Sequence, residues 1–546
     1  MTHPLHFLPL GGSGEIGMNL NLYEYGGSWL MCDLGVTFAG EELPGIDLVM
    51  PDISYIAERR QHLLGLVLTH AHEDHMGAVP YLWPLLRCPV YATPFTAALL
   101  AEKLHEGADG IHEMDIRVID PGSTLKLGPF SVALHGLTHS IPEPSALVLD
   151  TPAGSIMHTG DWKLDPEPLI SDPVDEDAIR KSGDSGILAM VCDSTNVFRP
   201  GTSGSEADVR RSLIEEVAGR RGRVAVTTFA SNLTRLLSIH QAAEANDRRC
   251  VALGRSMWRI IKCARQTGYL PPDTQFMSDR DARHLAPDKV LYMLTGSQGE
   301  PNAALSRIAA GNHQTVTLEA GDHVIFSSKI IPGNERAIFD LINRLTHLGI
   351  ETVTEDERFV HVSGHPNREE LARMYALVRP QYAIPVHGEL RHLREHATLA
   401  ESLGVEPVRG VANGSLVRLA PGTPSVVRTV THGRVAWTGR HTVPVNGPLI
   451  RERRDAMTCG VVIITLVVDH EGDLAADPHV ALIGLGEEPD TALSIADDAA
   501  DTFEDLRPHE RMMDEDIMRA LRPVPRRWLG GTRARRPVTR IAIIRI

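Results

Sequence analysis

Three histidines and two carboxylates lie within six consecutive positions of this chain, a density that suits a metal site. The stretch reads His70-Ala71-His72-Glu73-Asp74-His75. It follows residues 63–68, a short apolar run that is typical of a buried β-strand. On an extended backbone His70 and His72 point to the same side, and Asp74 and His75 can face that space as the chain turns. A polar surface loop is the alternative, but it does not explain why the cluster directly follows an apolar strand.

Three more predicted strands end in a residue that can bind a metal ion. His139 follows residues 132–137, Asp161 follows a predicted β-hairpin, and His387 follows residues 382–386. One metal ion needs three or four ligands, whereas two ions that share a bridging carboxylate need about seven. The sequence offers seven: His70, His72, Asp74, His75, His139, Asp161 and His387.

We therefore expect two divalent ions, with zinc as the first choice and manganese or magnesium as alternatives. The expected grouping is His70, His72 and His139 on one ion, Asp74, His75 and His387 on the other, and Asp161 bridging both. Two ions about 3.5–4 Å apart can hold a hydroxide that attacks an ester-like centre. In that reaction Asp74 would have a catalytic part as well. Asp33 also ends a predicted strand; it could support a ligand from behind, or it could be an ordinary strand-end aspartate.

The elements around these residues indicate an α/β protein with an insertion. Residues 5–35 alternate apolar and polar positions, which predicts antiparallel strands joined by tight turns. The Gly-rich stretch 11–17 lacks the GK[ST] ending of a phosphate-binding loop, so we interpret it as a turn. After residue 200, helices alternate with short strands, which predicts a parallel sheet. The predicted domains are a first part over 1–200, an insertion over 201–360, a return over 361–424, a linker over 425–457 and a small α/β C-terminal domain over 458–546.

The composition favours a cytoplasmic protein without a membrane anchor. No apolar run of the 546 residues approaches the roughly 20 that a membrane-spanning helix needs, and the first residues lack the features of a signal peptide. The six cysteines are scattered and form no CxxC pair. This argues against a disulfide framework and against a thiolate zinc site.

The formal charge of −16 weighs against non-specific nucleic-acid binding, but the charge is unevenly distributed. Residues 459–523 hold 16 acidic and 4 basic residues, whereas residues 199–265 hold 13 basic and 6 acidic ones. Residues 524–546 contain seven arginines and no acid. The negative charge is therefore concentrated away from the segment that we expect to meet a polyanion.

Taken together, these motifs resemble the metallo-β-lactamase fold and its β-CASP nucleic-acid-processing branch. Residues 193–195 resemble motif A, residues 363–365 motif B and residues 385–389 motif C. Within that branch the chain is most similar to the bacterial ribonuclease J family, over roughly residues 5–450. Further matching stretches are His158-Thr159-Gly160-Asp161-Trp162-Lys163, Thr228-Phe229-Ala230-Ser231-Asn232, Thr295-Gly296-Ser297-Gln298-Gly299-Glu300-Pro301 and His361-Val362-Ser363-Gly364-His365. The resemblance implies an αββα metallo-β-lactamase sandwich with an inserted β-CASP domain.

The resemblance also implies an activity. A member of this family cleaves single-stranded RNA as an endonuclease and as a 5′→3′ exonuclease, leaves 5′-phosphates, and acts in RNA maturation, including that of rRNA, and in RNA decay. His365 would protonate the leaving 3′ oxygen, and Asp193 would orient His365. The family also suggests a homodimer or homotetramer formed through the C-terminal domain, with other RNA-decay proteins as further partners.

A pocket for RNA and its terminal phosphate is expected in turn-like stretches that can offer hydroxyl and N–H groups. The candidates are Ser231, Asn232, His361, Ser363, Gly364 and His365. His361 could equally be an ordinary strand histidine. Arg255, Arg259 and Lys262 share one helix face, which is either solvated or part of an RNA groove.

Two other classes of protein compete with this hypothesis. A metallo-hydrolase of another ester on the same fold would not need about 150 inserted residues or a second histidine motif. A non-catalytic RNA-binding protein would not need an intact set of seven ligands. A DNA-directed nuclease stays open as an alternative, because contacts to a 2′-hydroxyl cannot be recognised in a sequence.

Overall fold

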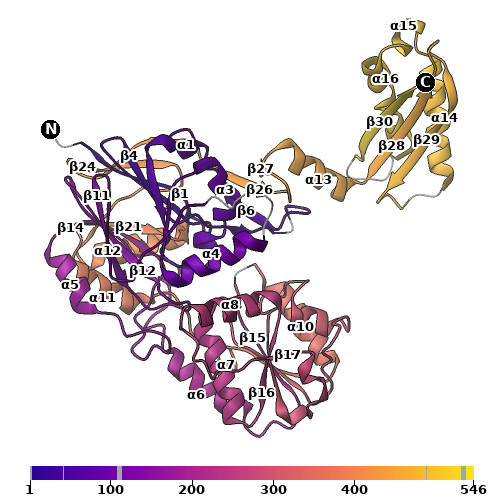
Figure 1. Ribbon diagram of the computed structural model, residues 1–546. Helices are drawn as coiled ribbons and strands as arrows, with labels where there is room; N and C mark the ends of the chain where they lie inside the picture. The colour runs from indigo at the N-terminus through magenta and orange to yellow at the C-terminus, as the bar shows by residue number, and fades with distance from the viewer. Residues whose placement is uncertain (1–2, 41, 107–113, 332, 487–488, 530–535) are drawn as a thin grey trace. The chain divides into compact units, whose positions relative to one another are not determined.

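The computed structural model describes residues 3–40, 42–106, 114–331, 333–486, 489–529 and 536–546 (Figure 1). The chain forms two compact units. The first contains residues 1–37 and 50–433, and the second contains residues 38–49 and 434–546. Two of the seven C-terminal arginines, Arg533 and Arg535, lie outside the described residues.

The first unit begins with an eight-stranded sheet that is antiparallel on one side and parallel on the other. Its order is β25 (Ser425–Thr429), β24 (Ser415–Ala420), β1 (Leu5–Gly11), β3 (Leu20–Tyr25), β4 (Ser28–Cys32), β7 (Leu63–Val67), β8 (Val90–Ala92) and β9 (Ile116–Val118). Strands β1, β3 and β4 pair antiparallel, as the alternating pattern of residues 5–35 predicts. Helix α4 (Pro94–Glu106) packs against β8 and β9, and α3 (Val79–Leu86) packs against α4.

A second sheet of seven strands lies against the first. Its order is β10 (Thr124–Leu127), β11 (Phe130–Gly136), β12 (Ser145–Thr151), β13 (Gly154–His158), β14 (Ile187–Asp193), β21 (Tyr382–Val386) and β23 (Glu406–Pro407). One buried core joins side chains of both sheets, among them Phe7 and Tyr23 from the first and Leu147 and Val191 from the second.

Helices cover the other face of this second sheet. They are α5 (Glu176–Asp184), α11 (Arg368–Val378) and α12 (Leu390–Ser402). Their apolar residues Ile179, Leu371 and Leu399 share a separate core with Met157 and Met190 of the sheet. The order helix, sheet, sheet, helix confirms the expected αββα sandwich.

The chain between β14 and α11 forms a third, fully parallel sheet. Its order is β17 (Met277–Ser278), β16 (Arg249–Leu253), β18 (Val290–Leu294), β15 (Val224–Thr227), β19 (His323–Phe326) and β20 (Glu351–Val353). The connecting helices are α6 (Glu206–Val217), α7 (Leu233–Ala245), α8 (Arg255–Gln266), α9 (Ala304–Ala309) and α10 (Glu335–His347). Figure 1 shows these helices around the sheet. This is the inserted α/β domain that the alternation of helices and strands predicts.

The second unit contains a three-stranded sheet of β29 (Leu474–Ile483), β28 (Val461–Val468) and β30 (Val538–Arg545). Helices α14 (Pro489–Glu504), α16 (Asp514–Leu521) and α17 (Val524–Leu529) pack on it around a core that includes Ile464, Phe503 and Leu521.

Residues 425–457, which we predicted to be a linker, form regular secondary structure. It contributes β25 to the first unit, and β26 (Arg434–Trp437), β27 (Thr442–Pro444) and most of α13 (Pro448–Cys459) to the second. The bounds of the five domains stay predictions. Among the described residues, no helix combines the length and apolar character needed to span a bilayer.

Candidate metal centre

The seven predicted ligands lie at one edge of the sandwich, in the loops that follow β7, β11, β13 and β21. The first four are on or next to α2 (Glu73–Met76), which begins six residues after β7 ends. His139, Asp161 and His387 follow the other three strands. Their ligand atoms fall into two groups that share Asp161, and within each group all atoms lie within 4.8 Å of one another.

The first group consists of His70, His72, His139 and Asp161. The Nδ1 atom of His72 lies 3.1 Å from Nε2 of His70 and 3.0 Å from Nε2 of His139. Oδ2 of Asp161 lies 3.9 Å from each of those Nε2 atoms. Four ligands at zinc distances in a tetrahedron are roughly 3.3 Å apart, so this spacing suits a tetrahedral ion.

The second group consists of Asp74, His75, His387 and Asp161. Oδ2 of Asp161 lies 3.1 Å from Nε2 of His75 and 3.4 Å from Nε2 of His387. Oδ2 of Asp74 lies 3.5 Å from each of the same two nitrogens. The two groups match the expected grouping of ligands, and one oxygen of Asp161 faces both.

The surroundings of Asp161 fit a pair of cations. The residue is 2% exposed, and its Oδ1 atom is buried without a hydrogen-bond partner among the described residues. A buried carboxylate oxygen without a partner is costly, unless a cation or a hydrogen-bond donor lies beside it. A divalent ion in either group would supply the missing charge.

The protonation of the histidines differs between the two groups. Burial lowers the pKa of His72 to about 4 and holds the pKa of His70 and His139 well below the usual value. These three side chains are therefore neutral at pH 7, with a free lone pair each. Burial also acts to lower the pKa of His387, but the carboxylates of Asp161, Asp193 and Asp74 raise it to about 9. The second group therefore attracts positive charge, as a proton or as a metal ion.

A network behind the ligands fixes their orientation. Oδ2 of Asp33 lies 2.7 Å from Nδ1 of His75 and accepts a hydrogen bond from the Thr69 hydroxyl at 2.8 Å. The Thr69 hydroxyl also lies 3.1 Å from Nδ1 of His70. Such partners hold the ring and select which nitrogen faces the metal. Of the two roles considered for Asp33, the structure therefore favours support of a ligand. The sequence did not identify Thr69 as part of this network, although it directly precedes His70.

The Gly-rich stretch 11–17 holds His387 in place. Its strand β2 (Ser13–Gly14) pairs with β22 (Gly388–Glu389), and the carbonyl of Gly12 accepts a hydrogen bond from the His387 N–H at 2.6 Å. His387 has a φ of 52°, a left-handed conformation that is uncommon for residues other than glycine. The stretch is therefore not the simple turn that we predicted, because it contains the end of β1, strand β2 and a bridge from Glu15 to Gly388. No feature of the sequence indicates that it contacts His387.

His365 and Asp193 form a pair next to the two groups. Nδ1 of His365 lies 2.8 Å from Oδ2 of Asp193 and 3.8 Å from Oδ2 of Asp161. Asp193 ends β14 and is 1% exposed; its other oxygen accepts hydrogen bonds from the Thr195 N–H and hydroxyl. The amide of Asn196 donates to the carbonyl of His365 at 3.2 Å. The motif A loop thus holds the motif B histidine at two points.

Several candidates for the phosphate pocket have other partners. The carbonyl of Gly364 lies 2.6 Å from Nδ1 of His139, so this residue orients a candidate metal ligand. The Asn232 side chain caps α7 by accepting from the Arg235 N–H, and the Ser363 hydroxyl accepts from the Asn196 amide.

His361 and Ser231 lie near the same loops. Nδ1 of His361 lies 3.3 Å from the Arg235 guanidinium, and burial lowers the pKa of His361 well below its usual value. Ser231 is partly exposed at the carboxyl end of β15. A role of these residues in phosphate binding stays a prediction.

On α8, Lys262 forms an ion pair of 2.8 Å with Glu102 of α4. One of the three basic residues on that helix face is therefore already paired with a carboxylate.

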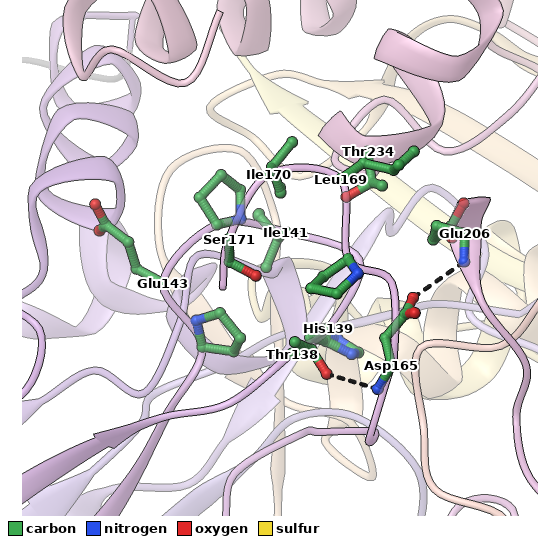
Figure 2. A pocket seen from close by; sticks show the side chains of 13 residues that line it. Thr138, His139, Ile141, Glu143, Asp165, Leu169, Ile170, Ser171, Glu206 and Thr234 are labelled. Atoms are coloured by element: carbon green, nitrogen blue, oxygen red, sulfur yellow. Dashed lines mark hydrogen bonds between the residues drawn. The ribbon is translucent and has the colours of Figure 1, made fainter. Parts of the chain in front are cut away.

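A pocket is lined by His139 and Asp165 of the sandwich and by Glu206 of the inserted domain (Figure 2). Its polar lining is a chain of hydrogen bonds, in which the Asp165 N–H donates to the Thr138 hydroxyl and the Glu206 N–H donates to Asp165. Glu206 begins α6, and its carboxylate forms a buried ion pair of 3.0 Å with Arg235 of α7. Arg235 also donates to the carbonyl of Val360. These contacts tie the inserted domain to the segment that carries His365.

Comparisons with known families agree with the fold and with a metal-dependent hydrolase. The family described as "Ribonuclease J, beta-CASP domain" matches residues 221–345. The "Zn-dependent metallo-hydrolase RNA specificity domain" matches residues 350–409, and the "Beta-lactamase superfamily domain" matches residues 40–175. A solved structure of a protein of unknown function from Enterococcus faecalis V583 superposes with a TM-score of 0.52 at 16% identity, over 79% of this chain and all of that one, which supports the fold alone.

Curated relatives match over almost the whole chain. Ribonuclease J of Sinorhizobium meliloti is 44% identical, covering 99% of this chain and 97% of the relative. Ribonuclease J of Mycolicibacterium smegmatis is 39% identical over the same shares, and that of Thermus thermophilus is 35% identical over 88% and 84%. The chain therefore belongs to the ribonuclease J family of metal-dependent β-CASP ribonucleases.

Proposed function

We propose that the chain cleaves phosphodiester bonds of single-stranded RNA and leaves 5′-phosphates, as an endonuclease and as a 5′→3′ exonuclease in RNA maturation and decay. The observation that supports this best is the position of Asp161, whose Oδ2 atom faces both groups of ligands and lies 3.8 Å from His365. Two divalent ions, zinc in the first instance, would supply Lewis acidity that neutralises charge developing on the phosphate.

In the proposed reaction the chain contributes a proton and the geometry for its transfer. The carboxylate of Asp193 holds Nδ1 of His365, so the other ring nitrogen can donate to the leaving 3′ oxygen. Asp193 itself is fixed by Thr195, so the His365 ring has a defined orientation before RNA binds. This arrangement suits a general acid whose partner stays a carboxylate throughout.

We further propose that Ser231, His361 and the 363–364 backbone read the 5′-phosphate of the RNA. His361 lies 3.3 Å from the Arg235 guanidinium, and because its pKa is lowered it is neutral and can donate one hydrogen bond to a phosphate oxygen. The cytoplasm is the proposed location, because the described cysteines are all free thiols. A homodimer or homotetramer through the C-terminal domain is proposed by family resemblance.

The decisive experiment compares 5′-monophosphate, 5′-triphosphate and 5′-hydroxyl forms of one single-stranded RNA, with elemental analysis of the purified protein. We expect cleavage with a preference for the monophosphate, and no cleavage by His72→Ala. His365→Ala should retain its metal but lose about 100-fold or more in rate. Retained cleavage by His72→Ala would exclude the metal-dependent mechanism, and equal rates on all three RNAs would exclude the terminal-phosphate pocket.

A further inference from the structure

An aromatic ring is exposed beside the candidate active centre. Phe198 follows Asp193 by five residues, and 47% of it is accessible to solvent. The intervening loop is held against motif B, because Asn196 donates to the carbonyl of His365 and the Arg199 N–H donates back to the carbonyl of Asn196. Phe198 therefore has a fixed position relative to His365, although its ring contributes to none of the described apolar cores.

Two residues at the start of α12 hold one side of this ring. The ring of His392 meets it at 64° with the centroids 5.3 Å apart, and the guanidinium carbon of Arg391 lies 5.7 Å from its centroid. Arg391 is oriented by an ion pair of 3.0 Å with Glu389. His392 is 5% exposed, and its Nδ1 atom has no hydrogen-bond partner among the described residues. Arg391 and His392 lie four and five residues after His387, and Phe198 lies five residues after Asp193. Both segments that form the aromatic site therefore begin at the candidate active centre.

The neighbourhood of Phe198 carries positive charge. Nζ of Lys329 donates to Oδ1 of Asn196 at 3.2 Å, two residues before the ring. Burial and the Arg199 guanidinium lower the pKa of Lys329, and Glu355 offsets part of this effect. Arg199 is exposed and interacts electrostatically with Glu355, whose pKa it acts to lower. Arg199 thus lies on the loop that carries the exposed ring and Lys329 contacts that loop, in a chain whose formal charge is −16.

We propose that Phe198 is a stacking site for one base of the RNA, and that Arg199 and Lys329 contact the phosphate next to that base. Stacking on an aromatic ring combined with backbone cations is the usual way to bind single strands without sequence preference. Phe198 shares a loop with Asp193, which orients His365, the proposed proton donor to the leaving 3′ oxygen. We therefore place the stacked base on the side of the scissile bond that keeps this 3′ oxygen. This inference rests on the proposed function and adds a binding site for the nucleotides upstream of the scissile bond.

The test uses one 5′-monophosphate single-stranded RNA and four derivatives, each with one abasic nucleotide at one of the first four positions. The full-length protein is compared with Phe198→Ala, Phe198→Trp and the control Phe339→Ala, whose residue on α10 is 53% exposed. On intact RNA, Phe198→Ala should lower kcat/KM about tenfold, mainly through KM, whereas Phe198→Trp and Phe339→Ala should stay within threefold of the unmodified protein. On one abasic RNA, Phe198→Ala and the unmodified protein should become equal, because the base that stacks is already absent.

Other outcomes would overturn the inference. Unchanged kcat/KM of Phe198→Ala on intact RNA would exclude the stacking site. An equal loss on all four abasic RNAs would show that the ring acts only through the fold. If the unmodified protein cleaved no RNA, the proposed function would fail together with this inference, whereas cleavage without a Phe198 effect would exclude the stacking site alone.

Discussion

Nδ1 of His365 lies 2.8 Å from Oδ2 of Asp193, although 172 residues separate them in the chain. The pair joins the end of β14 to the segment that follows the whole inserted domain. It brings together the two segments of the sandwich that flank the inserted domain. A histidine that must protonate a leaving oxygen depends on such a partner for its tautomer and its direction.

Asp193→Ala should therefore lower kcat on RNA, by about 10- to 100-fold, while metal content and RNA affinity stay unchanged. His365→Ala should cost at least as much, and the double variant little more, because both residues act in one step. Steady-state kinetics of the three variants test this. Losses that multiply in the double variant would show that Asp193 acts independently of His365.

Chelation of the metal should abolish RNA cleavage and lower the midpoint of thermal unfolding. Without a cation, Oδ1 of Asp161 is buried without a hydrogen-bond partner among the described residues, so metal binding stabilises the folded state. Readdition of Zn²⁺ or Mn²⁺ should restore both properties, and Asp161→Asn should respond to neither ion. An unchanged unfolding midpoint after complete metal removal would argue against a site in these two groups.

Asp33→Ala should weaken metal binding by about 10- to 100-fold, because it removes the carboxylate that orients His75. Titration of metal-free protein with Zn²⁺ measures the change. Asp175→Ala is the control, since Asp175 only caps α5 and lies on the surface. If both variants bound metal like the unmodified protein, the contact to His75 would have no influence on the site.

Gly364→Ala should displace His139, because an added Cβ would lie 2.6 Å from Cε1 of its ring. We expect loss of metal from the first group and loss of activity in a protein that still folds. Gly136→Ala is a matched control three residues before His139, where an added Cβ would meet no atom within 4 Å. Metal content and circular dichroism of the two variants distinguish the outcomes, and full metal occupancy in Gly364→Ala would contradict the geometry.

Arg235→Met should destabilise the protein by about 3–5 kcal/mol, because it leaves the Glu206 carboxylate buried without a partner. The additional change Glu206→Leu should recover much of that loss, since it removes the unpaired charge. Arg211→Met, on an exposed ion pair with Glu167, should change stability little. Chemical unfolding followed by tryptophan fluorescence measures all three. Equal stability of Arg235→Met and Arg211→Met would exclude the buried pair as a structural tie.

Most of the fold and the residues that form the candidate metal centre could be predicted from the sequence, because both depend on local patterns. Apolar runs that end in histidine or aspartate indicate a strand with a ligand after it, and four such places were enough to name all seven residues from His70 to His387. The alternation of helices and strands after residue 200 likewise predicts a parallel sheet, since each element must bury one face. Such patterns do not decide the role of Asp33, because a place after a strand suits both a residue that supports a ligand and an ordinary strand-end aspartate.

Only the tertiary structure decides which residues meet across long distances in the chain. The contacts of Gly364 with His139, of Gly12 with His387 and of Phe198 with Arg391 join segments that are 190 or more residues apart. A backbone carbonyl or an exposed ring has no distinctive pattern along the chain, because its role depends on what the other segments place beside it. The sequence by itself determines the chemistry that is available, whereas packing of the two sheets and the inserted domain determines how those groups are oriented.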